Sequence, residues 1–378
     1  MRPLRIGFEQ TGLELDATGT ARSIRRLGRE LEGDPAVELV PLAQPGRARG
    51  GTRGRVARGL RRELSYLPFA LPRRAARLGL ELLHCPVPLA PVRSRVPVAI
   101  TVHDVMALEH PEWFTVANRL QQRLVLGPAA RRAVVVLTPS EASRKGAIEW
   151  LDLDPERVRV TPWGVDEVFS LRPPSEDTLV RLGVHGRYLL TVGALRPRKN
   201  LEGALAAFEA LTAHDDLALV VAGGRGWDDG DLLARLGRSP AADRIRLTGQ
   251  VSDEDLAELY RGTECFLFPS RYEGFGLPPL EAMACGAPVV SSDRSSMPEV
   301  VGDAALLVSP DDTAGWVSAV EGMLASPERR ADLVERGRRR AAGFTWQRCA
   351  RATVEAYRFA LERGSPESAR SAARTARQ

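Results

Sequence analysis

Short apolar runs rich in valine, isoleucine and leucine alternate along the chain with longer stretches of helical periodicity. Their almost continuous apolar character is typical of parallel strands that are covered by helices on both faces. The first series of runs is RIGFE, VELVPLA, LLHCPV, VAITVHD and AVVVLTPS, and the second is YLLTVGAL, LALVVAGG, IRLTGQV, CFLFPS, PVVSS and ALLVSP. The pattern predicts an α/β protein with two tandem Rossmann-like, doubly wound domains, whose ligand should lie outside the carboxyl ends of the strands.

Prolines and glycines interrupt the pattern in TPWGVDEVFSLRPP, residues 161–174, between the two series. We therefore predict an N-terminal domain at residues 1–165 and a C-terminal domain at 166–345, with a hinge near Gly164. The amphipathic run FTWQRCARATVEAYRFALERG predicts a long helix at about 346–363, and we expect this helix to pack back on the first domain. The polar tail at 364–378 is predicted to be disordered.

The composition, with 44% apolar and 27% charged residues, is that of a globular protein. The chain contains no run of about 18 apolar residues, and its start leads directly into a strand-like segment, so we expect a cytoplasmic protein. The four cysteines are scattered, without a close pair or a histidine at ligand spacing. The sequence therefore predicts reduced, packed thiols and no metal site.

Positive charge is concentrated between Arg47 and Arg77, where ten arginines face one acid, Glu63. Such a strip indicates an anionic surface, either phospholipid or nucleic acid, or else a solvated loop in an arginine-rich chain. We favour docking on anionic lipid at the inner face of the plasma membrane. The apolar residues assigned to this docking surface are Leu60, Leu64, Tyr66, Leu67, Phe69 and Leu71. Two aromatic residues are too few for a stacking platform, so no nucleic acid partner is expected.

Two acids, Glu273 and Glu281, are separated by seven residues in the segment SRYEGFGLPPLEAMACGAPVV. CFLFPS before them predicts a strand, and PPLEAMACG predicts a helix. A glycine-containing loop between a strand end and a helix start exposes backbone N–H groups that bind anions and sugar hydroxyls. Two carboxylates can accept several hydroxyl hydrogen bonds. The spacing equally fits a capping loop whose acids face solvent or pair with Arg271.

Arg198 and Lys199 follow the strand-like run in TVGALRPRKN, at the start of a predicted helix. Only Lys145 and Lys199 are lysines among 53 basic residues, and this departure from arginine favours a functional role. A departing nucleoside diphosphate gains negative charge, which arginine, lysine and a helix N-terminus can neutralise. An exposed basic helix start is the alternative, although the helix dipole disfavours it.

His103 ends the run VAITVHD, at the edge where α/β sheets bind ligands, although a lone histidine is more often structural. Gly19 and Thr20 lie in TGTARS, just before a predicted helix. This loop lacks the GxGxxG pattern of dinucleotide-binding proteins, which argues against a nicotinamide cofactor.

Seven segments in order resemble glycosyltransferase family four, and the similarity extends over residues 4–360. They are TGTARSIRRL, LLHCPVPLAP, ITVHDVMALEHPEWF, VTPWGVDEVF, TVGALRPRKNL, IRLTGQVSDEDLAELYRGTECFLFPS and YEGFGLPPLEAMACGAPVVSSDRSSMPEVVGDAALLVSPDD. The resemblance implies the two-domain GT-B architecture, in which the two Rossmann-like domains face each other across a cleft. It also implies a retaining, metal-independent hexosyltransferase without a cofactor. Its partners would be a nucleotide-sugar donor and a saccharide or lipid-linked acceptor. VTPWGVD, GALRPRKNL and HDV are most similar to polysaccharide mannosyltransferases, so GDP-mannose is the first expectation and a UDP-sugar the second.

The resemblance also implies roles for individual residues. Glu273 would hold the donor hexose, Lys199 and Arg198 would neutralise the diphosphate, and His103 would lie near the donor sugar. Many family members carry an arginine near the position of Ala194, which this sequence lacks, and Arg198 is expected to supply its positive charge. The donor-binding set is Gly274, Phe275, Gly276, Leu277, Pro278, Glu281 at the ribose, and Gly249 and Val251 near the base; Gly19 and Thr20 form the phosphate and acceptor loop. A catalytically silent nucleotide-sugar or lipid-binding protein is the alternative, which the complete set of charged residues disfavours.

Overall fold

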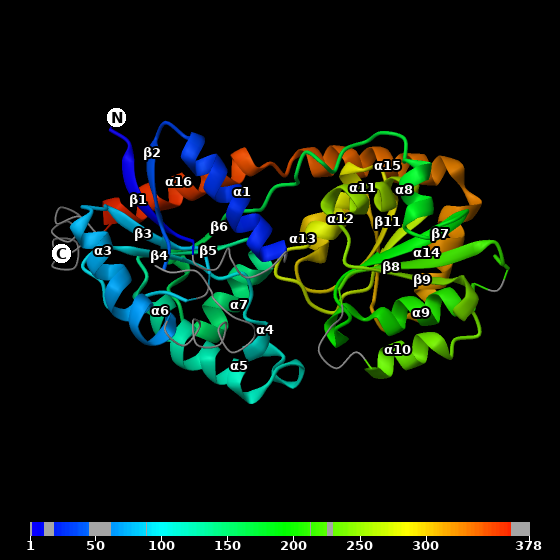
Figure 1. The fold of residues 1–378 in the computed structure, drawn as a ribbon, viewed down its shortest axis with the longest axis horizontal. Coiled ribbons are helices and arrows are strands. Elements are labelled where there is room, and N and C mark those ends of the chain that lie inside the picture. Colours follow the sequence, from blue (N-terminus) through cyan, green and yellow to red (C-terminus); the bar gives the residue numbers. More distant parts are fainter. Residues whose placement is uncertain are drawn as a thin grey trace, which may run out of the picture. The chain divides into compact units, whose positions relative to one another are not determined.

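The computed structural model describes residues 2–10, 19–44, 62–87, 89–211, 213–224 and 230–363. The chain divides into two compact units, one formed by Met1–Gly164 with Trp346–Gln378 and the other by Val165–Thr345 (Figure 1). The final helix, α16 (Trp346–Arg363), therefore belongs to the first unit although it follows the second in the chain. The tail predicted to be disordered, 364–378, and residues 47–61 of the arginine strip lie outside the described residues.

A parallel six-stranded sheet forms the centre of the first unit, in the order β2-β1-β3-β4-β5-β6. Its strands are β1 (Leu4–Glu9), β2 (Val37–Leu42), β3 (Leu82–Cys85), β4 (Val98–Thr101), β5 (Val135–Thr138) and β6 (Val158–Val160). The sequence pattern predicts all of these except β6. That strand has three residues, Val-Arg-Val, too short and too polar to form an apolar run.

Successive strand residues face opposite sides of this sheet, so strands such as β3, β4 and β5 contribute to two hydrophobic cores. Leu82, Ala99 and Val135 pack with α1 and α16 on one side. Their neighbours Leu83, Val98 and Val136 pack in the core that includes residues of η2, α3, α6 and α7. The helices of this unit are α1 (Gly19–Gly33), η2 (Arg62–Ala70), α3 (Leu71–Arg77), α4 (Met106–Glu109), η3 (Pro111–Trp113), α5 (Val116–Gln121), η4 (Gln122–Leu126), α6 (Gly127–Arg132), α7 (Glu141–Leu151), η5 (Pro155–Arg157) and α16.

The second unit contains another parallel six-stranded sheet, in the order β12-β11-β10-β7-β8-β9. Its strands are β7 (Arg187–Val192), β8 (Leu217–Ala222), β9 (Ile245–Gly249), β10 (Cys265–Phe268), β11 (Val289–Ser292) and β12 (Leu306–Val308). Renumbered within the unit, this is the doubly wound order 3-2-1-4-5-6, which reverses direction between β7 and β10. Ligands of such sheets bind outside the carboxyl ends of the strands at this switch point.

Helices surround the second sheet as well. They are α8 (Glu176–Arg181), η6 (Pro197–Lys199), α9 (Leu201–Ala210), α10 (Gly230–Gly237), η7 (Ala242–Arg244), α11 (Asp253–Gly262), α12 (Leu277–Ala284), α13 (Met297–Val301), η8 (Gly302–Ala304), α14 (Thr313–Ala325) and α15 (Pro327–Ala342). The apolar face of α9 packs with strand residues and with Trp316 of α14 in one core. The structure thus confirms the two parallel sheets, each covered by helices, that the alternating pattern predicts.

The apolar half of the predicted membrane surface is wrong for three of the four assigned residues whose exposure the structure describes. Tyr66, Leu67 and Leu71 are at most 3% exposed and belong to the core of the first unit, so they cannot insert into lipid. Phe69 is 55% exposed, on the opposite side of the same helical segment. The described part of the chain has no helix that is long and apolar enough to cross a bilayer.

Candidate active site

The candidate site lies at the switch point of the second sheet. β7 leads through the loop 193–196 into η6, which contains Arg198 and Lys199. β10, its neighbour in the sheet, leads through the loop 269–276 into α12. Because β7 and β10 are adjacent and parallel, residues that are more than seventy positions apart in sequence meet at one edge.

Glu273 binds both predicted cations. Lys199 Nζ lies 2.6 Å from Glu273 Oε1, and Arg198 Nη1 lies 2.9 Å from Glu273 Oε2. The side chains of Lys199 and Glu273 are only 14% and 11% exposed, so these ion pairs are largely shielded from water. The structure therefore brings together three of the four predicted catalytic residues. Arg271 pairs instead with Asp311, at 2.5 Å, which removes the alternative that it neutralises Glu273.

The pKa values of this cluster are strongly perturbed. Burial pushes the pKa of Lys199 down, the nearby Arg198 also lowers it, and the Glu273 carboxylate offsets part of the effect, so that it lies at about 8. Burial raises the pKa of Glu273, but Arg198 and Lys199 lower it to about 2. Glu273 is consequently an anion at neutral pH and can accept hydrogen bonds but cannot donate a proton.

Serine side chains hold the loop that carries Glu273. Ser270 Oγ donates to Glu273 Oε1 at 2.6 Å, which orients the carboxylate. Ser295 and Ser296 follow β11, and their hydroxyls donate to the Glu273 carbonyl oxygen at 2.7 and 2.9 Å. Ser296 also donates to the carbonyl of Phe275. The sequence analysis missed these serines because no motif marks them, although their position after a strand of the same sheet is the signal that could have found them.

Helix α12 begins directly after the glycine loop, as predicted. Gly276, its N-cap, has φ of 124°, a conformation that side-chain-bearing residues rarely adopt. Leu277 and Pro278 form the first turn, and the ring nitrogens of two consecutive prolines leave fewer N–H donors there than an ordinary helix start has. Glu281 lies further along the helix, is 2% exposed, and accepts a hydrogen bond from the Tyr260 hydroxyl at 3.4 Å.

Two further predicted residues extend this edge along the sheet. Gly249 ends β9, and its carbonyl accepts a hydrogen bond from Gly223 N at 2.9 Å. The space beside Gly249 is open. Val251 follows it in the loop before α11 and is half-buried.

The remaining predicted residues belong to the first unit. His103 follows β4, its Nε2 lies 2.8 Å from the Pro86 carbonyl oxygen, and its ring is tilted against Trp163. Burial lowers the pKa of His103 to about 4, partly offset by the hydrogen bond to Pro86, so the ring is neutral at physiological pH. Gly19 and Thr20 form the first residues of α1.

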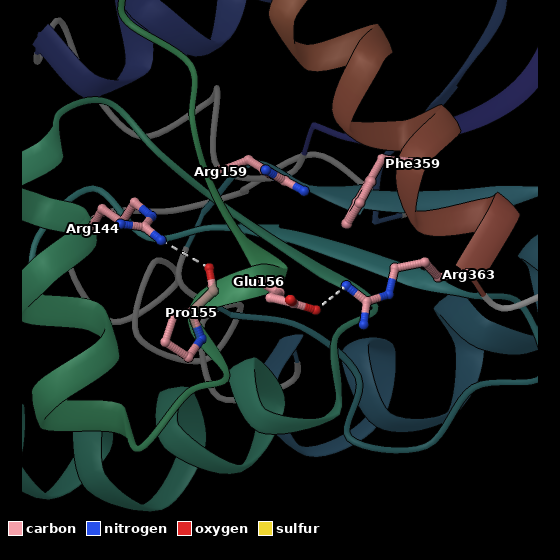
Figure 2. A pocket seen from close by; sticks show the side chains of 6 residues that line it. All are labelled: Arg144, Pro155, Glu156, Arg159, Phe359 and Arg363. Atoms are coloured by element: carbon pink, nitrogen blue, oxygen red, sulfur yellow. Dashed lines mark hydrogen bonds and ion pairs between the residues drawn. The ribbon is translucent and has the colours of Figure 1, made fainter. Parts of the chain in front are cut away.

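A surface pocket in the first unit contains none of the predicted site residues. Figure 2 shows it between β6 and α16, where Arg144 and Arg363 are held by the Pro155 carbonyl and by Glu156. The guanidinium of Arg159 lies 3.9 Å from the Phe359 ring centre. This pocket lies beside the edge strand, away from the carboxyl ends where parallel sheets bind ligands.

The four cysteines are buried free thiols, and burial raises the pKa of Cys265, Cys285 and Cys349 to about 12. No group of three or more histidine, cysteine, aspartate or glutamate side chains in the described ranges is arranged to hold a metal ion.

Comparison with solved structures defines the class of protein. Sucrose-phosphate synthase from Thermosynechococcus elongatus superposes with a TM-score of 0.74 at 22% identity, covering 94% of this chain and 98% of that one. WaaG, a glycosyltransferase involved in lipopolysaccharide biosynthesis, superposes with a TM-score of 0.68 at 15% identity, covering 93% and 98%. At these identities the likeness establishes the fold alone, which is the GT-B fold of glycosyltransferases.

Sequence comparison gives the family. The model for glycosyl transferases group 1 matches residues 182–340, and the model for glycosyltransferase family 4 matches residues 17–169. The chain is 35% identical to O-antigen chain mannosyltransferase B of Escherichia coli over 68% of its own length and 69% of that protein. It is 36% identical to MMP alpha-(1->4)-mannosyltransferase of Mycolicibacterium hassiacum over 62% of its length and 56% of that protein. The chain belongs to glycosyltransferase family four and is a glycosyltransferase.

Proposed function

We propose that the enzyme transfers mannose from GDP-mannose to a hydroxyl of a saccharide or lipid-linked acceptor, with retention of configuration and without a divalent metal. The mannosyltransferases of Escherichia coli and Mycolicibacterium hassiacum among its relatives support the choice of sugar. A UDP-sugar is the second choice, because a structural neighbour binds UDP and glucose.

The observation that carries the proposal is the cluster of Arg198, Lys199 and Glu273 at the switch point of the second sheet. In the absence of donor, Glu273 balances the two buried cations. When a nucleotide sugar binds, Arg198 and Lys199 stabilise the negative charge that develops on the departing diphosphate. Their positions are fixed by the folded loops before the reaction, so little reorganisation is needed in the transition state.

The remaining roles follow from the chemistry of each group. Glu273, ionised and oriented by Ser270, accepts hydrogen bonds from the donor hexose, together with the N–H groups of the loop. Glu281 binds the ribose hydroxyls. Its carboxylate accepts a hydrogen bond from Tyr260 in the structure, so a ribose hydroxyl must reach the same carboxylate. The neutral His103 serves the donor sugar as a hydrogen-bonding group.

The acceptor is proposed to be presented at a membrane. Arg73, Arg74 and Arg77 of the arginine strip are exposed, so their positive charges can attract an anionic lipid surface. Of their apolar neighbours, Tyr66, Leu67 and Leu71 are buried and Phe69 is exposed, so this strip would attach the protein mainly by charge.

Donor identity is tested by thermal-shift measurements with GDP, UDP, ADP and dTDP and their sugars, since a bound ligand raises the apparent stability. We expect GDP and GDP-mannose to give the largest shifts and GDP-mannose to be consumed with a saccharide acceptor. A larger thermal shift with UDP than with GDP would show that the donor is a UDP-sugar and not GDP-mannose. Binding without turnover across a broad acceptor panel would contradict the catalytic assignment.

The site itself is tested by Lys199→Ala. Removing one well-placed charge stabiliser typically lowers the rate by about 10² to 10³. Lys145→Ala is a matched control, because Lys145 is the only other lysine and lies exposed on α7. Equal activities of the two variants would remove Lys199 from the site.

A further inference from the structure

The surface pocket beside the edge strand β6 is rich in positive charge (Figure 2). Its volume is about 330 Å³, and Arg144, Arg159 and Arg363 line it together with a single acid, Glu156. Three guanidinium groups and one carboxylate leave a net charge of +2. Such a volume lies at the lower end of the range for pockets that hold small molecules. The pocket therefore has the size and the charge to hold a small anion.

Arg159 lies in the middle of β6, between Val158 and Val160. Val158 belongs to the core that includes residues of α7, so the side chain of Arg159 faces the other side of the sheet, toward α16. There its guanidinium lies over the ring of Phe359. Within the described part of the chain this guanidinium has no hydrogen-bond or ion-pair partner, although it carries five N–H donors. These donors are available to a ligand in the pocket.

Arg144 extends into the pocket from α7 and is fixed by three contacts. Its Nε and Nη2 donate to the carbonyl oxygens of Val158 and Pro155, each at 3.0 Å, and its Nη1 pairs with Glu141 at 2.9 Å. The contact with Val158 covers part of the open edge of β6, which protects an edge strand from pairing with another chain. Edge protection accounts for Arg144, but it requires no second and third arginine in the same pocket.

Arg363 reaches the pocket from α16 and pairs with Glu156 at 2.6 Å. The two side chains are 49% and 67% exposed, and ion pairs with this exposure contribute little to stability. An anion of higher charge can therefore displace Glu156 from Arg363. Glu156 thus competes with a ligand of the pocket instead of completing the site.

We propose that this pocket binds a phosphate monoester of about the size of a hexose phosphate, with Arg159 and Arg363 as hydrogen-bond donors and Arg144 as a fixed positive charge. A phosphate monoester carries about 1.5 to 2 negative charges at pH 7, which matches the net charge of the pocket. Its three oxygens accept hydrogen bonds from more than one guanidinium, whereas the fork of one arginine satisfies a carboxylate. The pocket belongs to the first unit and the donor cluster to the second, so this proposal does not depend on which donor the enzyme uses.

The test is hydrogen exchange of the full chain with and without inorganic phosphate or mannose 6-phosphate. A ligand that bridges β6 and α16 opposes their local opening, so we expect slower exchange in these two elements. Mannose 6-phosphate should bind more tightly than inorganic phosphate, because its sugar fills more of the cavity. Phosphate bound at the donor site would instead slow exchange around η6 and α12, so the two sites are measured separately. Equal affinities would limit the pocket to inorganic phosphate, and no protection of β6 and α16 by either ligand would overturn the proposal.

Two substitutions in the pocket should change the affinity in opposite directions. Arg159→Gln should raise the ligand concentration that gives half of the protection by about tenfold or more, because charge-assisted hydrogen bonds are lost. Glu156→Gln should lower that concentration by about two- to fivefold, because its carboxylate no longer competes for Arg363. The matched control is Arg246→Gln, which changes an exposed arginine of the edge strand β9 in the second sheet and should bind as the unchanged protein does.

Thermal unfolding verifies that each variant is folded. A pocket whose arginines serve only the packing of the first unit would not bind phosphate more tightly in Glu156→Gln. Undiminished binding by Arg159→Gln, or weaker binding by Glu156→Gln, would therefore contradict the proposal.

Discussion

At the residue scale, the properties of the site depend on the opposing charges of Lys199 and Glu273. Each charge favours the ionised form of the other, whereas burial favours the neutral form of both. At Lys199 the effect of burial is the larger, and the pKa is lowered to about 8. At Glu273 the effect of the neighbouring cations is the larger, and the pKa is lowered to about 2. Lys199 is thus the member of the pair that titrates near physiological pH.

Turnover should therefore fall as pH rises through about 8, because the ammonium group that stabilises the diphosphate is lost. In Glu273→Gln the fall should move to lower pH, since the carboxylate that raises the pKa of Lys199 is absent. The measurement is the turnover rate of the unchanged protein and of Glu273→Gln as a function of pH. An unshifted profile would show that the titrating group is not Lys199.

Unfolding does not explain the expected loss of turnover. The pKa of Lys199 in the folded protein lies below its ordinary 10.5, so between about pH 8 and 10.5 the unfolded chain binds the proton more readily. The contribution of this group to the free energy of unfolding therefore increases as pH rises across that interval. Denaturant titrations at about pH 8 and about pH 10.5 distinguish a loss of turnover from a loss of stability.

At the element scale, the loop from Ser270 to Gly276 depends on a backbone conformation that suits glycine. Gly276 has φ of 124°, and a β-carbon there would collide with the terminal methyl group of Met297 in α13. Gly276→Ala should destabilise the second unit by about 1–3 kcal/mol and displace the start of α12. Adding Met297→Ala should restore only the steric part of this loss, because the strain in φ remains. Denaturant unfolding measures both, and full restoration by the second substitution would contradict the conformational argument.

The predictability of the elements and of the site has a common physical basis. Buried parallel strands are nearly uniform apolar runs, so the pattern identifies them, whereas β6 contains Arg159 at its centre and escapes it. Glu273 and Lys199 could be placed at one edge because each follows such a strand. The supporting Ser296 could not, since its role depends on a loop after a third strand folding over Glu273.

Helical periodicity alone does not reveal which apolar face is covered. Tyr66 and Leu67, assigned to a membrane surface from their arginine-rich surroundings, are buried, whereas Leu120 and Leu124 have core-like spacing and are exposed. Spacing fixes which residues share a face, and only the packing of neighbouring elements decides whether that face meets protein or solvent.

At the scale of the whole molecule, the chain leaves the first unit near Gly164, forms the second unit, and returns as α16. The return is fixed by a buried polar chain in which the Tyr357 hydroxyl lies 2.6 Å from His84 Nδ1, while His84 Nε2 lies 2.8 Å from Thr101 Oγ1. Burial lowers the pKa of His84 to about 3, so the ring is neutral, with one donor and one acceptor nitrogen, and both are satisfied.

Tyr357→Phe should consequently destabilise the first unit by about 1–3 kcal/mol, because it leaves a buried imidazole nitrogen without a partner. The effect should be confined to the unit that α16 completes, which hydrogen exchange of backbone amides can resolve segment by segment. Tyr188→Phe is the reciprocal control, since the buried Tyr188 hydroxyl donates to the Leu259 carbonyl oxygen at 2.8 Å in the second unit. We expect faster exchange in β3, β4 and α16 for the first variant and in β7 and α11 for the second. If Tyr357→Phe accelerated exchange equally in both units, the two would unfold as one cooperative body, and α16 would not act on the first unit alone.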